Sequence, residues 1–478
     1  MNFRFASLLI KSFLLGLLPV VHAQMLEVPP YIQPGTVHDL HHESKVIIWQ
    51  TDSTKADFIV EYQKGTSFDG SAHLHHAKVV PFRLELGKEV SWLYRAHLEH
   101  LEFDAEYVYR VRLENRPISQ AVFRTRTIHP KTRFAVFGDC GVGSPGQAAV
   151  AYQVSKLNPD FVLLTGDNVY SSGLASEYRK RFFTTYMAPM ASPGRGAPLM
   201  QRIPFYSLLG NHDIRGNDLR INPDGMAWYY YSDLPLNGPI TEHEPELLGK
   251  THQIAHFKRA TEHRFPKMSN YSFQHGNVHI VCIDANTYVN PLDEGLINWL
   301  KNEFKHHKNE WRIVAYHQPG FNSSNAHYNY QVMRMLSPLL EELGVDLVLT
   351  GHVHNYQRSV PMKFAPELDK QGKYRSTSEG RVDGKFTLDL KFDGETITRP
   401  EGIVYITTGA GGAQLYDAEI SNNPKAWEHS PESNWVPFTK KLISDVHSFT
   451  WIETDHHTLT LSQIDSEGNT IDRITMTR

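Results

Sequence analysis

The sequence predicts a β sandwich followed by an α/β domain in which helices cover a sheet. The 478 residues are too many for one compact unit at about 100 to 200 residues per domain. Up to about residue 127, short alternating apolar runs follow one another without an amphipathic helix between them. Beyond that point, apolar strands alternate with helix-like stretches, which is the pattern of a sheet covered by helices.

The first 23 residues are typical of a signal peptide. An early positive charge at Arg4 precedes the apolar run 13–21, and the small residue Ala23 follows it. A transmembrane helix is the alternative, but the run is shorter than the roughly 18 residues that a span requires. We therefore expect a secreted or periplasmic protein that is cleaved after Ala23 and has no stable membrane insertion.

Residues 24–127 are predicted to form the β sandwich. The runs 45–49 and 58–62 alternate in polarity and are separated by Gly, Asp and Ser clusters. The segment 98–111 resembles the late strand of a fibronectin type III domain, with Tyr107 in a position suited to a tyrosine corner. The resemblance implies a fibronectin type III-like fold for this domain.

Residues 128–478 are predicted to form the α/β domain. Two polar stretches rich in Pro and Gly, 214–267 and 362–399, are expected to be insertions over one face, where long loops often carry function. The expected strands are 134–137, 161–164, 205–209, 278–283, 312–316, 347–349 and a closing antiparallel pair at 449–453 and 458–461, with helices at 147–157, 295–306 and 331–343.

Charge and cysteine content exclude some classes of protein. The net charge of −4 argues against a nucleic-acid binder that depends on a basic surface, but it leaves small anionic substrates open. Cys140 and Cys282 are too few for a disulfide framework, so the core must supply the stability. Two buried thiols are favoured over a bridge, and the oligomeric state is left open.

Five short motifs lie where apolar strands end. The ligand crevice of an open α/β sheet lies outside the carboxyl ends of its strands, so these loops should converge. Seven of their side chains, namely two carboxylates, one phenol, one amide and three imidazoles, make a set suited to Fe, Zn or Mn. Any one of them alone would be an ordinary turn or histidine. The motifs are Gly138-Asp139-Cys140-Gly141, Gly166-Asp167-Asn168-Val169-Tyr170, Gly210-Asn211-His212-Asp213, Val314-Ala315-Tyr316-His317 and Gly351-His352-Val353-His354.

In this order, the five motifs resemble those of the calcineurin-like metallophosphoesterases. Tyr170, three residues after Asp167, narrows the resemblance to the purple acid phosphatases. It covers about residues 133–354 and implies a double β-sheet flanked by helices. It also implies an acid phosphatase that hydrolyses phosphate monoesters by in-line attack of a metal-bound hydroxide.

The resemblance also implies a ligand set and a cofactor. The cofactor would be a ferric ion plus a second divalent ion, Fe, Zn or Mn. Its implied ligands are Asp139, Tyr170 and His354 for the ferric ion, Asn211, His317 and His352 for the divalent ion, and Asp167 for both.

Three further residues are expected to act on the substrate. His212 lies outside the implied ligand set, as an acid or a phosphate contact, with Asp213 expected to orient it. His327 shares that role or is a surface histidine. Plant-type purple acid phosphatases have two adjacent histidines here, whereas this chain has Ala326 before His327, which puts the substrate preference in doubt.

Two other functions remain as alternatives. One is a phosphodiesterase or nucleotide pyrophosphatase of the same superfamily, and the other is a non-catalytic binding protein on this fold. The complete set of seven coordinating residues argues against the second. Two histidine clusters outside the motifs are expected to lie on solvated loops, namely His38, His41 and His42, and His73, His75 and His76.

Overall fold

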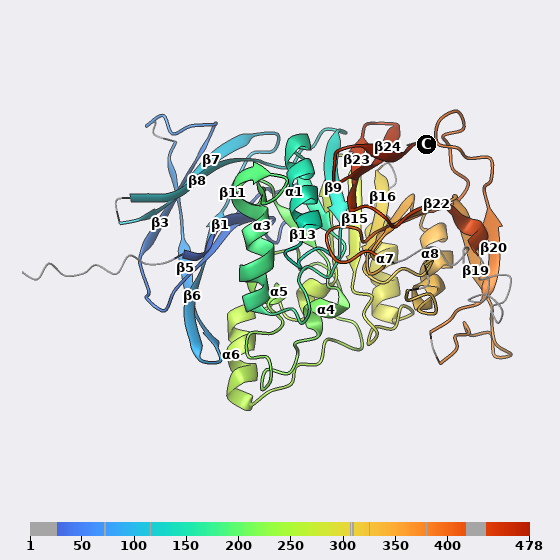
Figure 1. Ribbon diagram of the computed structural model, residues 1–478, viewed down its shortest axis with the longest axis horizontal. Helices are drawn as coiled ribbons and strands as arrows, with labels where there is room; N and C mark the ends of the chain where they lie inside the picture. Colours follow the sequence, from blue (N-terminus) through green and yellow to red (C-terminus); the bar gives the residue numbers. More distant parts are fainter. Residues whose placement is uncertain are drawn as a thin grey trace, which may run out of the picture.

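The computed structural model describes residues 26–70, 73–114, 116–305, 307, 310–324, 326–378, 380–416 and 436–478. The predicted signal peptide and its cleavage site after Ala23 lie outside the described residues. An all-β region comes first, and an α/β region follows it (Figure 1). The fold class predicted from the sequence is confirmed.

The all-β region is built of two four-stranded sheets. All pairings within them are antiparallel. The first sheet has the order β1 (Leu26–Gln33), β2 (Lys45–Thr51), β6 (Glu89–Leu98), β5 (Val79–Leu86). The second has the order β4 (His75–Ala77), β3 (Phe58–Lys64), β7 (Glu106–Leu113), β8 (Arg116–Arg124).

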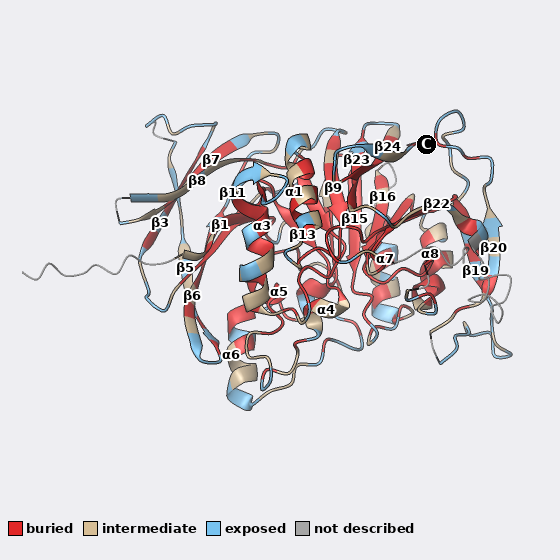
Figure 2. Cartoon of the chain, in the orientation of Figure 1, coloured by how far each residue is buried: buried red, intermediate tan, exposed pale blue. Residues whose placement is uncertain are grey.

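Strand β2 is buried on both of its faces, which explains how the β region is attached. Alternate residues of a strand point to opposite faces of the sheet. Ile47 and Trp49 belong to the core between the two N-terminal sheets. Val46 and Ile48 instead pack into the large core of the α/β region. The same strand therefore serves both cores, and the buried band in Figure 2 continues from one region into the other.

Tyr107 makes the contact expected of a tyrosine corner. Its hydroxyl accepts a hydrogen bond from the backbone N–H of Glu102, 3.1 Å away. Such a bond to the backbone a few residues upstream is typical of immunoglobulin-like sandwiches. The fibronectin type III likeness itself stays a prediction.

The α/β region contains two larger sheets. Each has a parallel part that is extended by antiparallel strands. The six-stranded sheet has the order β13 (Phe205–Ser207), β10 (Phe161–Leu164), β9 (Thr132–Phe137), β23 (Ser448–Thr454), β24 (Thr458–Asp465), β25 (Thr470–Thr477). The seven-stranded sheet has the order β14 (Tyr271–His275), β15 (Val278–Ile283), β16 (Trp311–Tyr316), β17 (Leu347–Thr350), β21 (Val404–Thr408), β18 (Tyr356–Ser359), β22 (Thr439–Ile443).

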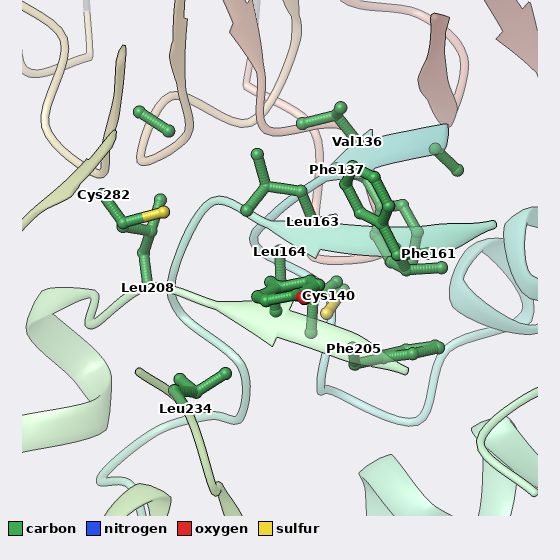
Figure 3. Packing of buried hydrophobic residues seen from close by; sticks show 14 of the residues in the cluster. Val136, Phe137, Cys140, Phe161, Leu163, Leu164, Phe205, Leu208, Leu234 and Cys282 are labelled. Carbon is green, nitrogen blue, oxygen red and sulfur yellow. The ribbon is translucent and has the colours of Figure 1, made fainter. Parts of the chain in front are cut away.

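One core joins these two sheets. It includes Val136 and Leu163 from the first sheet with Ile280 and Ile313 from the second. Figure 3 shows part of this core, in which side chains from β9, β10 and β13 lie near Cys140 and Cys282. The free cysteines Cys140 and Cys282 are both buried there, as the sequence predicted.

Helices lie against the outer faces of the sheets. A separate apolar cluster joins α7 (Glu294–Lys305) and α8 (Ser337–Glu342) to the seven-stranded sheet. On the side of the six-stranded sheet lie α1 (Pro145–Leu157), α2 (Ala175–Glu177), the π-helical turn η1 (Tyr178–Phe182) and α3 (Phe183–Tyr186). None of the helices in the described ranges has the length and apolar character needed to cross a membrane.

The stretch 214–267 differs from its prediction. Although polar overall, it contains α5 (Trp228–Tyr231), whose aromatic side chains are buried in the main core, and α6 (Thr251–Thr261). In α6, the ring nitrogen Nε2 of His256 accepts a hydrogen bond from the backbone N–H of Glu85 in β5, at 3.0 Å. This segment thus connects the two regions rather than only covering one face.

Three smaller differences concern segment types. The predicted helix 331–343 begins as a 3-10 helix over Val332–Leu336 and becomes α-helical only in α8. The closing strand pair gains a third strand, β25. Within 362–399, the antiparallel pair β19 (Met362–Pro366) and β20 (Gly384–Leu388) forms a separate ribbon at the end of the molecule opposite the β region (Figure 1).

Candidate metal centre

The five motifs meet at the carboxyl ends of the parallel strands. Asp139 follows β9, Asp167 follows β10, Asn211 follows β13, His317 follows β16 and His352 follows β17. Their side chains lie within a few ångströms of one another, as the distances below show. The predicted convergence of the motifs is therefore present in the structure.

The Tyr170 hydroxyl is the centre of the first group of side chains. It lies 3.1 Å from Asp139 Oδ1, 3.1 Å from Asp167 Oδ2 and 3.1 Å from His354 Nε2. One phenol proton can satisfy only one of these acceptors. The remaining acceptor atoms face one another in a buried site and repel one another. A bound cation would relieve this repulsion.

His317 is the centre of the second group. Its Nε2 lies 3.2 Å from Asn211 Oδ1 and 3.3 Å from Asp167 Oδ1. Asp167, His317 and His352 each offer a ligand atom within 4.8 Å of the others, the one such group of three or more His, Cys, Asp or Glu in the described parts of the chain. Asp167 contacts both groups and so joins them.

Backbone carbonyls fix two of the imidazoles. The Nδ1 of His317 lies 2.8 Å from the carbonyl oxygen of Thr165, and the Nδ1 of His354 lies 2.7 Å from that of Gln414. A carbonyl can only accept, so each Nδ1 carries a proton and each Nε2 is the ring nitrogen that faces the site. Hydrogen bonds of this kind are typical of metal-ligating histidines.

The backbone around these residues is constrained. Asp139, Asp167 and His352 have φ angles of 54°, 50° and 66°, in the left-handed region that side chains other than glycine rarely adopt. Such conformations cost about 1–3 kcal/mol each and persist where the surrounding structure enforces them, often at functional sites. At Gly210 the restriction is one of space, because a Cβ there would lie 2.1 Å from Asp167 Oδ1.

The electrostatics of the group also fit a cation. Burial raises the pKa of Asp139 well above its ordinary value. Burial and then the two carboxylates raise the pKa of the Tyr170 hydroxyl in the same direction. Both shifts disfavour negative charge on the donors. A bound cation would reverse this preference, and the mixed oxygen and nitrogen donors suit a first-row transition metal.

His212 lies at the edge of this group and is reachable from solvent. Its Nε2 is 4.0 Å from Asp167 Oδ2, and its side chain is 21% exposed. Its Nδ1 lies 2.7 Å from the carbonyl oxygen of Ser171, which therefore accepts the Nδ1 proton. His212 thus presents Nε2 toward the site.

Asp213 does not orient the His212 ring as expected from the sequence. Its carboxylate accepts hydrogen bonds from the backbone N–H of Gly210, at 2.9 Å, and from the side-chain amide of Asn168, at 2.9 Å. Burial and the neighbouring Asp167 carboxylate raise its pKa to about 7. Asp213 therefore joins the loops that carry Asp167 and Asn211, and the Ser171 carbonyl holds the ring of His212.

His327 lies at the site, and beside it is a residue that the sequence analysis missed. The Tyr416 ring stacks on His354 with centroids 4.2 Å apart and planes 5° apart. The Tyr416 hydroxyl lies 3.3 Å from His327 Nε2. Tyr416 comes shortly after β21, with glycines 409, 411 and 412 in between, so the strand-end logic applied to a sixth loop would have indicated this segment.

The two histidine clusters of the β region are not part of this site. His75 and His76 are exposed, as predicted, but they lie on strand β4 rather than on a loop. The His75 ring packs on Tyr62, with centroids 5.1 Å apart.

The chain is similar in sequence to known proteins. Residues 132–356 match the family model of the calcineurin-like phosphoesterases. The chain is 29% identical over 234 residues to purple acid phosphatase 17 of Arabidopsis thaliana, covering 47% of this chain and 62% of that protein. It is 31% identical over 237 residues to purple acid phosphatase 3 of the same plant, covering 46% and 57%. The chain thus spans less than two thirds of the length of these two relatives.

Solved structures share the fold. A purple acid phosphatase, PPD1 from yellow lupin seeds, superimposes with a TM-score of 0.62 at 16% identity, covering 94% of this chain and 74% of that one. The structure of PhoD gives a TM-score of 0.56 at 12% identity, covering 94% and 88%. The fold and the motifs define a calcineurin-like phosphoesterase domain in residues 132–356. Over just under half of its length, the chain is similar to purple acid phosphatases of Arabidopsis thaliana.

Proposed function

We propose that this protein is a secreted acid phosphatase that hydrolyses phosphate monoesters at a binuclear metal centre. The observation that carries the proposal is the position of the Tyr170 hydroxyl, 3.1 Å from each of three further donors, Asp139, Asp167 and His354. In the sequence, Tyr170 is the residue that narrows the resemblance from the calcineurin-like metallophosphoesterases to the purple acid phosphatases.

The donors divide into two sets around Asp167. Asp139, Tyr170 and His354 would hold a ferric ion, and Asn211, His317 and His352 would hold Fe, Zn or Mn as a divalent ion. Two ions bound there would polarise the phosphate oxygens and lower the pKa of a water molecule, so that hydroxide would be available to attack phosphorus.

His212 would supply the proton for the leaving group. When its Nε2 proton passes to the departing oxygen, the Nδ1 proton stays on the ring, because the Ser171 carbonyl accepts it in either charge state. His327, whose ring lies against that of His352 and has Tyr416 beside it, would contact the phosphate or the leaving group.

Substrate comparison and metal analysis test the proposal together. The purified protein should contain iron and release nitrophenol faster from p-nitrophenyl phosphate than from bis-p-nitrophenyl phosphate. Preference for the diester would indicate a phosphodiesterase of the same superfamily. Protein without metal or turnover would indicate a non-catalytic binding protein.

Export forms a separate part of the proposal. The signal-peptide pattern before Ala23 and the secreted character expected of this kind of enzyme support it. The intact mass of the protein recovered outside the cytoplasm should match a chain that starts at Gln24. A mature chain in the cytosol that begins at Met1 would contradict export.

A further inference from the structure

The His212 ring depends on a loop that has no regular secondary structure. Residues 171–174, here called the Ser171 loop, run from Tyr170 to the start of α2. The loop contributes the Ser171 carbonyl, 2.7 Å from His212 Nδ1. A hydrogen bond can fix a ring only if its acceptor is itself held, so the anchoring of this loop matters for proton transfer.

The Glu177 carboxylate anchors the loop. It accepts hydrogen bonds from three backbone N–H groups of the loop: those of Ser171, Ser172 at 3.1 Å and Leu174 at 3.1 Å. The bond to Leu174 is an ordinary helix cap, in which a glutamate at the third helical position binds the N–H at the helix start. The other two bonds lie beyond the helix, and a cap does not need them.

The peptide group between Ser171 and Ser172 is therefore held on both sides: its N–H, which is that of Ser172, donates to Glu177, and its carbonyl, which is that of Ser171, accepts from His212. The N–H of Ser171, which belongs to the preceding peptide group, also donates to Glu177. Arg181 adds a contact from the next turn: its Nη1 donates to the Tyr170 carbonyl and lies 3.7 Å from Glu177 Oε1. Only 13% of the Glu177 side chain is exposed, so water competes little for these bonds.

We propose that Glu177 is a positioning residue for His212. By holding the peptide group between Ser171 and Ser172, it aims the Ser171 carbonyl at Nδ1 of His212, which leaves Nε2 as the only ring nitrogen that gains and loses the catalytic proton. The leaving oxygen takes this proton as its bond to phosphorus breaks, and solvent returns a proton to Nε2. This inference rests on the proposed function.

The test compares two leaving groups. General acid catalysis matters most when the departing alkoxide is basic, as from glycerol phosphate, and least for p-nitrophenolate. Glu177→Gln keeps the size of the side chain and weakens its hold on the loop. We expect kcat to fall about tenfold on glycerol phosphate and less than about twofold on p-nitrophenyl phosphate, with KM unchanged.

Two further variants distinguish an effect through His212 from a non-specific effect of the substitution on the protein. The double variant Glu177→Gln with His212→Asn should be no slower than His212→Asn alone, because residues that act through one another are not additive. Glu89→Gln is the matched control: Glu89 also pairs with an arginine of η1, Arg179, at 2.6 Å, but its side chain is 64% exposed. This control should behave as the wild type on both substrates.

Amide hydrogen exchange gives a readout that needs no turnover. The amides of the Ser171 loop should exchange faster in Glu177→Gln than in the wild type or in Glu89→Gln. Equal losses on both substrates, additive losses in the double variant or unchanged exchange would each overturn the inference. Wild-type protein that cleaves neither ester would overturn the proposed function, while exchange would still decide whether Glu177 holds the loop. Glu177→Asp provides the same comparison if Glu177→Gln does not fold.

Discussion

The His327 ring lies against the His352 ring, with centroids 4.0 Å apart and planes 42° apart. From the sequence alone, His327 was as well explained by a surface position on a loop. Its φ of 59° is in the left-handed region, a conformation that the surrounding structure must enforce. His327 therefore faces the candidate metal centre from a constrained backbone and is a candidate for substrate contact.

His212→Asn should lose much more rate on glycerol phosphate than on p-nitrophenyl phosphate. Removing a general acid typically costs about 10² to 10⁴ in rate where the leaving group needs a proton. Both metals should stay bound, because His212 lies outside the proposed ligand set. Steady-state kinetics together with metal analysis checks this prediction. Equal losses on both substrates with weaker phosphate binding would make His212 a phosphate anchor instead.

His327→Ala separates a shared acid from a substrate contact. If His327 mainly binds phosphate, KM should rise about tenfold on both esters while kcat changes little. If it shares the proton transfer with His212, kcat should fall on glycerol phosphate alone. Tyr416→Phe is the companion variant, because it removes only the hydroxyl that lies 3.3 Å from His327 Nε2 and keeps the ring stacked on His354.

Tyr170→Phe should bleach the colour of the protein. A phenolate bound to ferric iron gives a visible charge-transfer band, so the wild-type enzyme should be violet to pink. Much of the hydrolysis should remain, because the phenolate is one ligand among several and is not the nucleophile. Visible spectra at equal iron content make the comparison. A variant that keeps the band would exclude Tyr170 as the ligand.

Strand positions were predictable from sequence because each buried strand is a short apolar run bounded by glycine or polar residues. The run 161–164 became β10 with the same bounds, and the strand-end rule placed Asp139 and Asp167 at one edge of the sheets. Local pattern sufficed there, because burial on both faces of a strand requires apolar residues throughout.

Contacts between distant loops were not predictable in the same way. Nothing near His212 in the sequence indicates that its Nδ1 donates to Ser171, 41 residues earlier, rather than to the adjacent Asp213. Which group accepts the Nδ1 proton depends on the direction of the Ser171 carbonyl in an irregular loop. Likewise, the aromatic residues of α5 sit in a stretch whose average polarity suggested a surface insertion. Contacts with distant segments bury them, such as those of Tyr231 with Phe183 and of Tyr230 with Phe257.

Gly210→Ala should prevent the protein from binding metal. The φ of Gly210 is −98°, which alanine adopts freely, so the effect is purely steric. The added Cβ would lie 2.1 Å from Asp167 Oδ1 and 2.2 Å from Asp167 N, far inside contact distance. Since Asp167 belongs to both donor groups, metal content and activity should fall together. Gly194→Ala is the control, because a Cβ there meets nothing within 4 Å; normal metal content in Gly210→Ala would contradict the prediction.

The folded protein should lose stability as the pH falls through about 6.5, partly because of His275. This residue ends β14, and its Nδ1 lies 3.2 Å from Thr132 Oγ1. Burial, reinforced by the positive charges of Arg126 and Lys45, holds the pKa of His275 well below its ordinary value of 6.5. The unfolded chain takes up a proton near pH 6.5 and the folded chain does not, so the contribution of the neutral ring is complete above that pH.

His275→Gln isolates this contribution, because glutamine can bond to Thr132 and does not titrate. One proton changes the free energy of unfolding by at most about 1.4 kcal/mol per pH unit, so the wild type should lose about 2 kcal/mol relative to His275→Gln between pH 7 and pH 5. Urea unfolding at both pH values measures the difference. His76→Gln, at an exposed position on β4, should follow the wild type. A constant difference between wild type and His275→Gln across this range would mean that His275 takes up its proton in the folded state as readily as in the unfolded chain.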